Sequence, residues 1–83
     1  MKSKYIDHLG IQTLARNVAE LRTAAGLSQA QLATKAGLPN ITIQKLEQGR
    51  LDPTYSVVCK LADALGVRLG ALGEGALPAK KEK

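Results

Sequence analysis

The sequence predicts an all-α fold, a compact bundle of four or five helices, and three observations support this class. Apolar residues recur at steps of three and four along most of the chain, which is the period of a helical face. The connections between these segments are short and contain glycine or proline. With 83 residues, the chain has room for one small domain with a single modest core.

A first helix is predicted to begin at Thr13, a suitable N-cap, and to end at Gly26. Residues 1–12 show no sustained period, and Gly10 weakens a helix there, so we expect an N-terminal arm over 1–12, or a short extra helical turn. The folded domain is then expected over 13–73. The inner face of this helix is formed by apolar residues at steps of four, three and four: Leu14, Val18, Leu21 and Ala25.

The second predicted helix opens with a capping box. The hydroxyl of Ser28 can accept a hydrogen bond from the backbone of Gln31, whose side chain can reach back to the backbone of Ser28. The helix then runs to about Ala36, where Gly37 ends it. Its inner face is expected to comprise Leu32, Ala33 and Ala36.

A third helix is expected over about 40–48, after Pro39 has redirected the chain. Proline biases the residue before it away from helix and is tolerated in a first helical turn. Gly49 suits the end of this helix because glycine readily adopts positive φ. The inner face is predicted to hold Ile43, Leu46 and Glu47.

A fourth helix is predicted to follow Thr54, a good N-cap, and to close at Gly66. Residues 67–72 fit either a short fifth helix or a strand, and the helix is slightly favoured. Residues 74–83 have the composition of a flexible basic tail. The inner face of the fourth helix is expected to contain Tyr55, Val58, Leu61, Ala62 and Leu65.

Charge and aromatic content favour duplex nucleic acid as a partner. The chain has 12 Lys and Arg against 7 Asp and Glu, which gives a formal net charge of +5. Such a balance suits a polyanion. There is no Phe or Trp and only two Tyr, whereas modules that bind single strands stack bases on aromatic side chains.

Other classes of function find little support in the sequence. The single histidine, His8, and the single cysteine, Cys59, do not make a catalytic or metal-binding group with any carboxylate pair, so we expect no enzyme, metal or cofactor. No stretch approaches the roughly 20 apolar residues of a membrane span. The lone cysteine suits a reducing compartment, and we expect a cytoplasmic protein without membrane contact.

The outer face of the third helix has an unusual composition. Side-chain amides both donate and accept, which matches an adenine edge in the major groove, while lysine suits guanine or phosphate and isoleucine suits the thymine methyl. The alternative interpretation of this face is an ordinary solvated helix surface. A short helix and a tight turn precede the third helix. This is the helix-turn-helix arrangement, which favours direct readout of base edges by the third helix. The stripe contains Asn40, Ile41, Gln44, Lys45 and Gln48.

The segment GLSQAQLATKAGLPNITIQKLEQGRLDPTYSVVCKLADALGV resembles the XRE-type, lambda-repressor and Cro-like helix-turn-helix family. The likeness covers about residues 13–72. GLSQ opens the second helix, I-x-x-L-E-x-G spans the third, and LADALGV closes the fourth. The resemblance implies a transcriptional regulator, expected to be a repressor, which binds a pseudo-palindromic double-stranded operator as a homodimer.

The resemblance also implies roles for individual residues. A structural ion pair is expected between Arg22 and Glu47, and an inward-facing carboxylate needs such a partner if it is buried. Pro39 departs from the family because serine or threonine commonly caps the third helix there. Ile41 replaces a more usual polar reader. Base contacts are implied for Asn40, Ile41, Gln44 and Lys45, and backbone contacts for Gln29, Thr42, Gln48 and Arg50.

Two alternatives stay open at this stage. One is an antitoxin, in which the same domain also binds a toxin protein; the short polar tail at 74–83 argues only weakly for it. The other is a protein-interaction module without specific DNA binding. The dimer interface is also open. Its candidates are the outer residues of the fourth helix, including Cys59, and the segment 67–72.

Overall fold

The computed structural model describes residues 8–72, and the regular elements of this part of the chain are all helices, with no strand. The all-α class is therefore confirmed. Segment 67–72 contains a short 3-10 helix, which settles the choice between helix and strand. Residues 1–7 of the expected arm and the tail at 74–83 lie outside the described residues. The elements are α1 (His8–Ala24), α2 (Gln29–Ala36), α3 (Asn40–Glu47), α4 (Tyr55–Leu65) and η1 (Leu69–Leu72).

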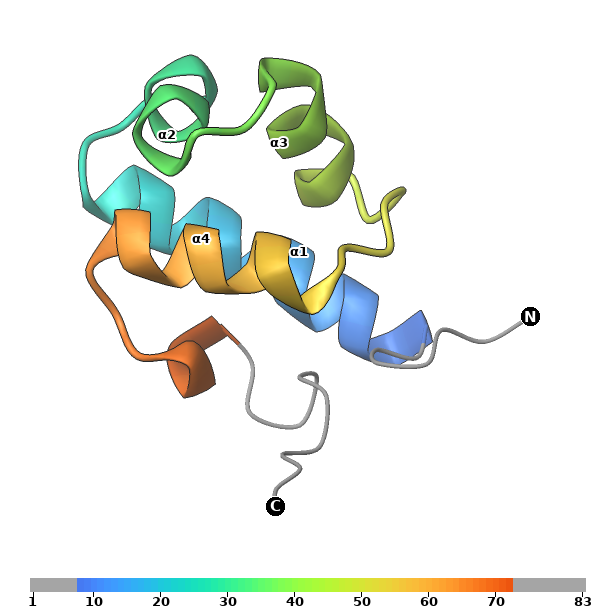
Figure 1. The fold of residues 1–83 in the computed structure, drawn as a ribbon. Coiled ribbons are helices and arrows are strands. Elements are labelled where there is room, and N and C mark those ends of the chain that lie inside the picture. Colours follow the sequence, from blue (N-terminus) through green and yellow to red (C-terminus); the bar gives the residue numbers. More distant parts are fainter. Residues whose placement is uncertain (1–7, 73–83) are drawn as a thin grey trace.

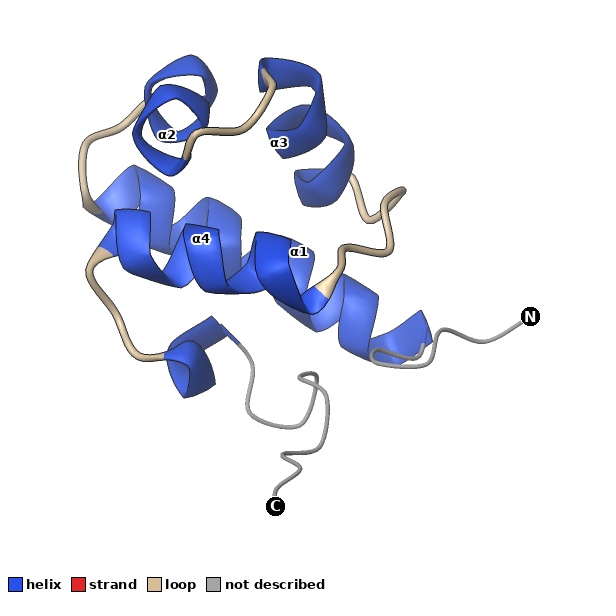
Figure 2. Ribbon diagram, in the orientation of Figure 1, coloured by secondary structure: helices blue, strands red, loops and turns tan. Residues whose placement is uncertain are grey.

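Helices α1 and α4 form the centre of the bundle, with α2 and α3 on one side and η1 on the other (Figures 1 and 2). Packing follows this arrangement: α1 contacts α3, α4 and η1, while α4 contacts α2 and η1. Asn17 of α1 fixes η1 by donating a side-chain hydrogen bond to the carbonyl of Leu72 at 3.0 Å. The side chains that are almost wholly buried are Leu14, Val18, Leu32, Ile43, Leu46, Val58, Leu61 and Leu72.

Helix α1 begins at His8 rather than at Thr13, so residues 8–12 extend the helix, as the alternative of an extra turn allowed, and the expectation of an arm was wrong for them. Glycine within a helix costs about 1 kcal/mol relative to alanine, which is why Gly10 argued against an early start. Tertiary packing outweighs that cost here, because Ile11 lies half-buried against the core.

Two predicted inner-face residues are exposed instead. Ala25 lies in the turn that follows the last residue of α1. Tyr55 is 43% exposed because it is the first residue of α4, and helical side chains point back toward the N-terminus, here beyond the edge of the core. The apolar periodicity in the sequence therefore includes residues at helix ends that are not buried.

The caps predicted at Ser28 and Thr54 are present, whereas Thr13, the N-cap predicted for the first helix, lies within α1. The hydroxyl of Ser28 accepts a hydrogen bond from the backbone N–H of Gln31 at 3.0 Å, and the backbone N–H of Ser28 donates to Gln31 Oε1 at 2.8 Å. Thr54 Oγ1 likewise accepts from the backbone of Val57 at 3.2 Å. Because these bonds satisfy orphan amides, they fix where α2 and α4 begin.

A Schellman motif ends α3 and fixes the residue that follows. Gly49 has a φ of +71°, and its N–H donates to the carbonyl of Leu46 at 3.0 Å. The N–H of Arg50 donates to the carbonyl of Lys45 at 2.9 Å. A Cβ on Gly49 would lie 2.9 Å from Nε2 of Gln12, whose side chain reaches across from α1.

We expect Gly49→Ala to lower the free energy of unfolding by about 1–2 kcal/mol, because the left-handed conformation strains an L-residue by that amount. Gly37→Ala is the matched control: its φ is +72°, and its Cβ would meet nothing within 4 Å. Similar losses in urea denaturation would mean that the exposed Gln12 moves aside. A much larger loss at Gly49 would show that Gln12 is held rigidly.

Candidate nucleic-acid interface

Helices α2 and α3 are two short helices joined by a tight turn. Gly37 ends α2 in the left-handed conformation, with a φ of 72°. Pro39 takes the N-cap position of α3 with a φ of −65° and a ψ of 145°, and makes no side-chain capping bond. Its carbonyl instead accepts from the backbone of Thr42 at 3.0 Å. Helix α3 therefore starts at Asn40 despite lacking a Ser or Thr cap.

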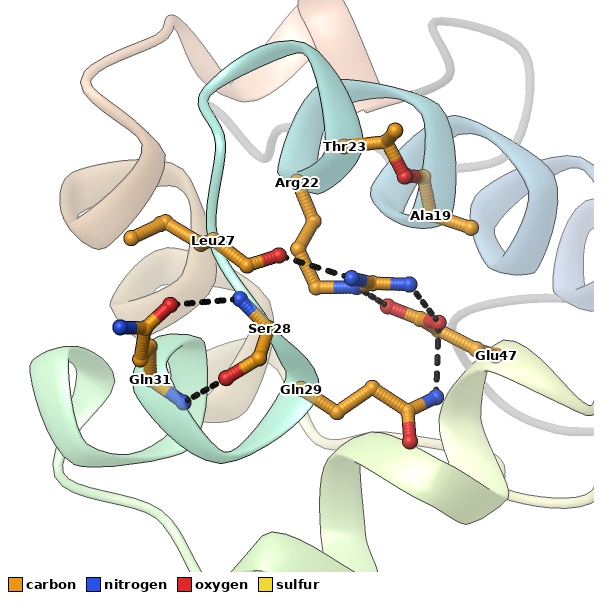
Figure 3. Close-up of polar contacts among 8 residues, drawn as sticks. All are labelled: Ala19, Arg22, Thr23, Leu27, Ser28, Gln29, Gln31 and Glu47. Carbon is orange, nitrogen blue, oxygen red and sulfur yellow. Dashed lines mark hydrogen bonds and ion pairs between the residues drawn. The ribbon is translucent and has the colours of Figure 1, made fainter.

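The structure brings Arg22 and Glu47 together in a two-pronged ion pair (Figure 3). Arg22 Nε donates to Glu47 Oε2 at 2.7 Å, and Nη2 donates to Oε1 at 3.1 Å. The remaining Nη1 donates to the carbonyl of Leu27 at 2.8 Å. Only 18% of the arginine and 7% of the glutamate side chain is exposed. The pair ties α3 to the end of α1 and to the loop before α2.

The hydrogen bond to Glu47 raises the pKa of the Arg22 guanidinium, and this outweighs the opposing effect of desolvation. A cation whose pKa is higher in the folded state stabilises that state at every pH below its ordinary value. Because the ordinary value for arginine is far above neutrality, this contribution is complete throughout the physiological range.

Gln29 is half-buried, and its amide joins the same group of residues. Its Nε2 donates to Glu47 Oε1 at 2.9 Å, while its carbonyl oxygen points away (Figure 3). Sequence reasoning had placed Gln29 at a phosphate but had not anticipated this bond. The two residues are 18 positions apart, so no local spacing signals their contact. One amide N–H of Gln29 is used internally, and Glu47 fixes the orientation of the amide group.

The other predicted contact residues lie on α3 or directly after it. Asn40, Ile41 and Lys45 are exposed, and Thr42 and Gln44 are half-buried. Their opposite face packs into the core. At the end of the helix, two further polar residues are exposed: Gln48 and Arg50. The structure thus gathers one hydrogen-bonding stripe on α3, with Gln29 set apart from it on α2.

The electrostatics of α2 and α3 favour an anionic partner. Lys35 and Lys45 are exposed, and Glu47 is the only carboxylate in the two helices. Because Arg22 neutralises Glu47, the two lysines determine the charge of this surface. The adjoining Arg50 adds a further positive charge beside the C-terminus of α3.

Gln12 is a polar neighbour of this surface that sequence reasoning missed. Its exposed amide lies against Gly49, beside Arg50. No role was predicted for Gln12 because it fell within the expected arm. Its position becomes visible only once α1 is known to extend back to His8.

The described residues contain no group of three histidine, cysteine or acidic side chains arranged to hold a metal ion. Between residues 8 and 72, no helix combines the length and the apolar character needed to cross a bilayer.

A capped helix, a tight turn and a second helix with an exposed hydrogen-bonding stripe together define a helix-turn-helix domain. The family model described as helix-turn-helix matches residues 18–72, which is more than half of the chain. The chain belongs to this XRE-type helix-turn-helix family, whose members are DNA-binding regulators rather than enzymes.

Comparison with known proteins shows several similarities. An uncharacterized HTH-type transcriptional regulator, y4dJ of Sinorhizobium fredii, is 39% identical over 51 residues, covering 61% of this chain and 66% of the relative. Multiprotein-bridging factor 1 of Candida glabrata is 37% identical over 76 residues, covering 89% of this chain and 48% of the relative. The chain thus spans less than two thirds of either relative.

Among solved structures, the restriction-modification controller protein C.AhdI from Aeromonas hydrophila has a similar fold. The TM-score is 0.73 and the sequence identity is 34%, over 75% of this chain and 94% of that one.

Proposed function

We propose that the protein is a transcriptional regulator that binds specific sequences in double-stranded DNA, with α3 inserted into the major groove. The observation that carries this proposal is the stripe of exposed polar side chains on a helix that Arg22 and Glu47 hold in place. An α-helix fits the major groove, and a fixed helix presents its side chains in a reproducible register.

In this proposal the residues divide into two groups. Side chains near the start and middle of α3 read base edges, because amides match adenine and lysine matches guanine. The second group contacts phosphates and sets the register of the protein on the duplex. The base readers are Asn40, Ile41, Gln44 and Lys45, and the backbone contacts are Gln29, Thr42, Gln48 and Arg50.

The proposed species on DNA is a homodimer acting in the cytoplasm. Two copies would place one α3 in each of two successive major grooves of a pseudo-palindromic operator. The half-buried Cys59 of α4 and the segment 67–72 supply the candidate contact surface between copies. Repression requires only that the bound dimer exclude other proteins from the operator, so we propose a repressor.

The test is selection from a random duplex library at about physiological salt, followed by titration of the selected site against scrambled duplex. An enriched inverted repeat with half-sites about one helical turn apart would support a sequence-specific dimer. A folded protein that enriches no sequence would contradict the proposal.

Gln44→Ala is expected to weaken binding to the selected site by about 1–3 kcal/mol, the contribution of a good base contact. Binding to scrambled duplex should stay unchanged, because non-specific binding depends on phosphate contacts. Fluorescence anisotropy on both duplexes provides the measurement. Equal losses on the two duplexes would rule out Gln44 as a base reader.

Arg50→Ala is expected to weaken binding to both duplexes about equally and to reduce the salt slope by about 1, because one phosphate contact is lost. Arg16→Ala on α1 is a control that removes the same charge from an exposed position outside the proposed DNA and dimer surfaces. If both variants changed the salt slope alike, the loss would reflect net charge and not a contact at Arg50.

A protein-interaction module is the second candidate, and the similarity to multiprotein-bridging factor 1 over 89% of the chain favours it. The same selection separates the two functions, because an interaction module enriches no operator. The antitoxin reading requires a toxin-binding surface in addition to DNA binding, so a toxin partner stays an open proposal that co-purification would test.

A further inference from the structure

Nothing in the fold requires the side chain of Ile41 to be exposed. It is 53% exposed on the stripe of α3, whereas Ile43, on the opposite face of the same helix, is fully buried. Tyr55 is the only other large hydrophobic side chain in the described part of the chain that is comparably exposed. Burial of apolar area stabilises folded proteins, and the exposed area of Ile41 makes no such contribution.

The surroundings of Ile41 indicate what would cover it. Asn40 and Lys45 are exposed polar side chains, and Gln44 follows on the next turn. All three can form hydrogen bonds, whereas Ile41 can recognise only an apolar group. In the major groove, the apolar group on a base edge is the 5-methyl of a pyrimidine.

The position and stiffness of Ile41 suit such a contact. It is the second residue of α3, and the N-terminal residues of a recognition helix reach base edges. A β-branched isoleucine has one strongly preferred χ1 rotamer in a helix, so it loses little conformational freedom on contact. A flexible side chain would read the same methyl less selectively.

We propose that Ile41 is a specificity-determining residue that recognises a pyrimidine 5-methyl group at one position of each operator half-site. The inference rests on the proposed function, because it requires α3 in the major groove. The methyl belongs either to thymine or to 5-methylcytosine. The neighbouring amides and lysine then determine which bases flank the methylated one.

The test replaces the thymines of the selected operator with deoxyuridine one at a time, which removes only the methyl. Each half-site should contain one sensitive thymine. Removing its methyl in one half-site should lower the affinity about fourfold, the equivalent of one buried methyl group, and removing it in both half-sites should lower the affinity about fifteenfold. Ile41→Ala should bind the thymine and uracil operators equally. Ile41→Val, which keeps the branched Cβ, should retain part of the discrimination.

Further operators distinguish the two sources of the methyl. A 5-methylcytosine·guanine pair at the sensitive position should bind more tightly than cytosine·guanine if the methyl itself is recognised. If the operator with 5-methylcytosine·guanine also binds more tightly than the operator with thymine·adenine, methylated cytosine is the natural target. If it binds less tightly than the thymine·adenine operator, the natural target is thymine. Thermal unfolding of both Ile41 variants verifies that they are folded, as an exposed position predicts.

The inference fails if no thymine in an enriched operator shows a methyl effect, or if the effect persists in Ile41→Ala. The proposed function survives either result, since the operator was still selected. The absence of any enriched operator would instead overturn the proposed function, and this inference with it.

Discussion

Replacing Leu61 by alanine is expected to lower the free energy of unfolding by about 3 kcal/mol, within the usual range for a buried leucine. Leu61 is fully buried on α4, the helix that contacts α1, α2 and η1. Its removal both loses apolar burial and leaves a cavity between several elements. A domain of this size has roughly 5–10 kcal/mol of stability in total, so a large fraction of the variant would unfold on modest heating.

Urea denaturation followed by circular dichroism measures this loss. Leu61→Met keeps the volume and should cost less than about 1.5 kcal/mol. Lys60→Ala, at the exposed neighbouring position, should stay within about 0.5 kcal/mol of the parent. A loss below about 1 kcal/mol for Leu61→Ala would mean that the core collapses around the cavity, or that α4 does not pack as described.

The features predicted best from the sequence are those encoded over a few residues. Ser28 and Gln31 are three residues apart, so their capping box could be foreseen, and both of its bonds are present. Gly37 and Gly66 ended helices where predicted, each with positive φ. Local spacing and propensity are sufficient for such features because every atom involved belongs to one turn of the chain.

Features that depend on segments far apart in the sequence were harder to predict from the sequence. The start of α1 was missed because a local penalty at Gly10 is offset by packing that only the assembled bundle provides. The bond from Gln29 to Glu47 depends on the angle between α2 and α3. Residues 67–72 were ambiguous in sequence; in the structure Leu72 is buried, and its carbonyl is bonded by Asn17.

One cluster links the fold of this domain to its proposed recognition surface. Glu47 accepts bonds from Arg22 on α1 and from Gln29 on α2. It stands on the inner side of the helix that presents Asn40 and Lys45 outward. A change at Glu47 is therefore expected to alter the position of α3 and the orientation of the Gln29 amide, although Glu47 itself does not lie on the proposed recognition surface.

Glu47→Ala is expected to lower the free energy of unfolding by about 2–3 kcal/mol, since it leaves a largely buried guanidinium and an amide without their acceptor. In a domain of this size that corresponds to a fall in Tm of about 10–20 °C. Glu20→Ala, which removes an exposed carboxylate from α1, should change Tm little and controls for net charge. An unchanged Tm for Glu47→Ala would mean that the ion pair does not stabilise the fold.

The double variant Arg22→Met with Glu47→Met separates stability from orientation. Replacing both members of a buried pair by apolar residues is often neutral or stabilising, so Tm should recover most of what Glu47→Ala loses. The amide of Gln29 would still lack its acceptor, and affinity for DNA should stay below that of the parent. Recovery of Tm together with full affinity would show that Glu47 acts on binding only through stability. Recovery of Tm alone would show that it also orients Gln29.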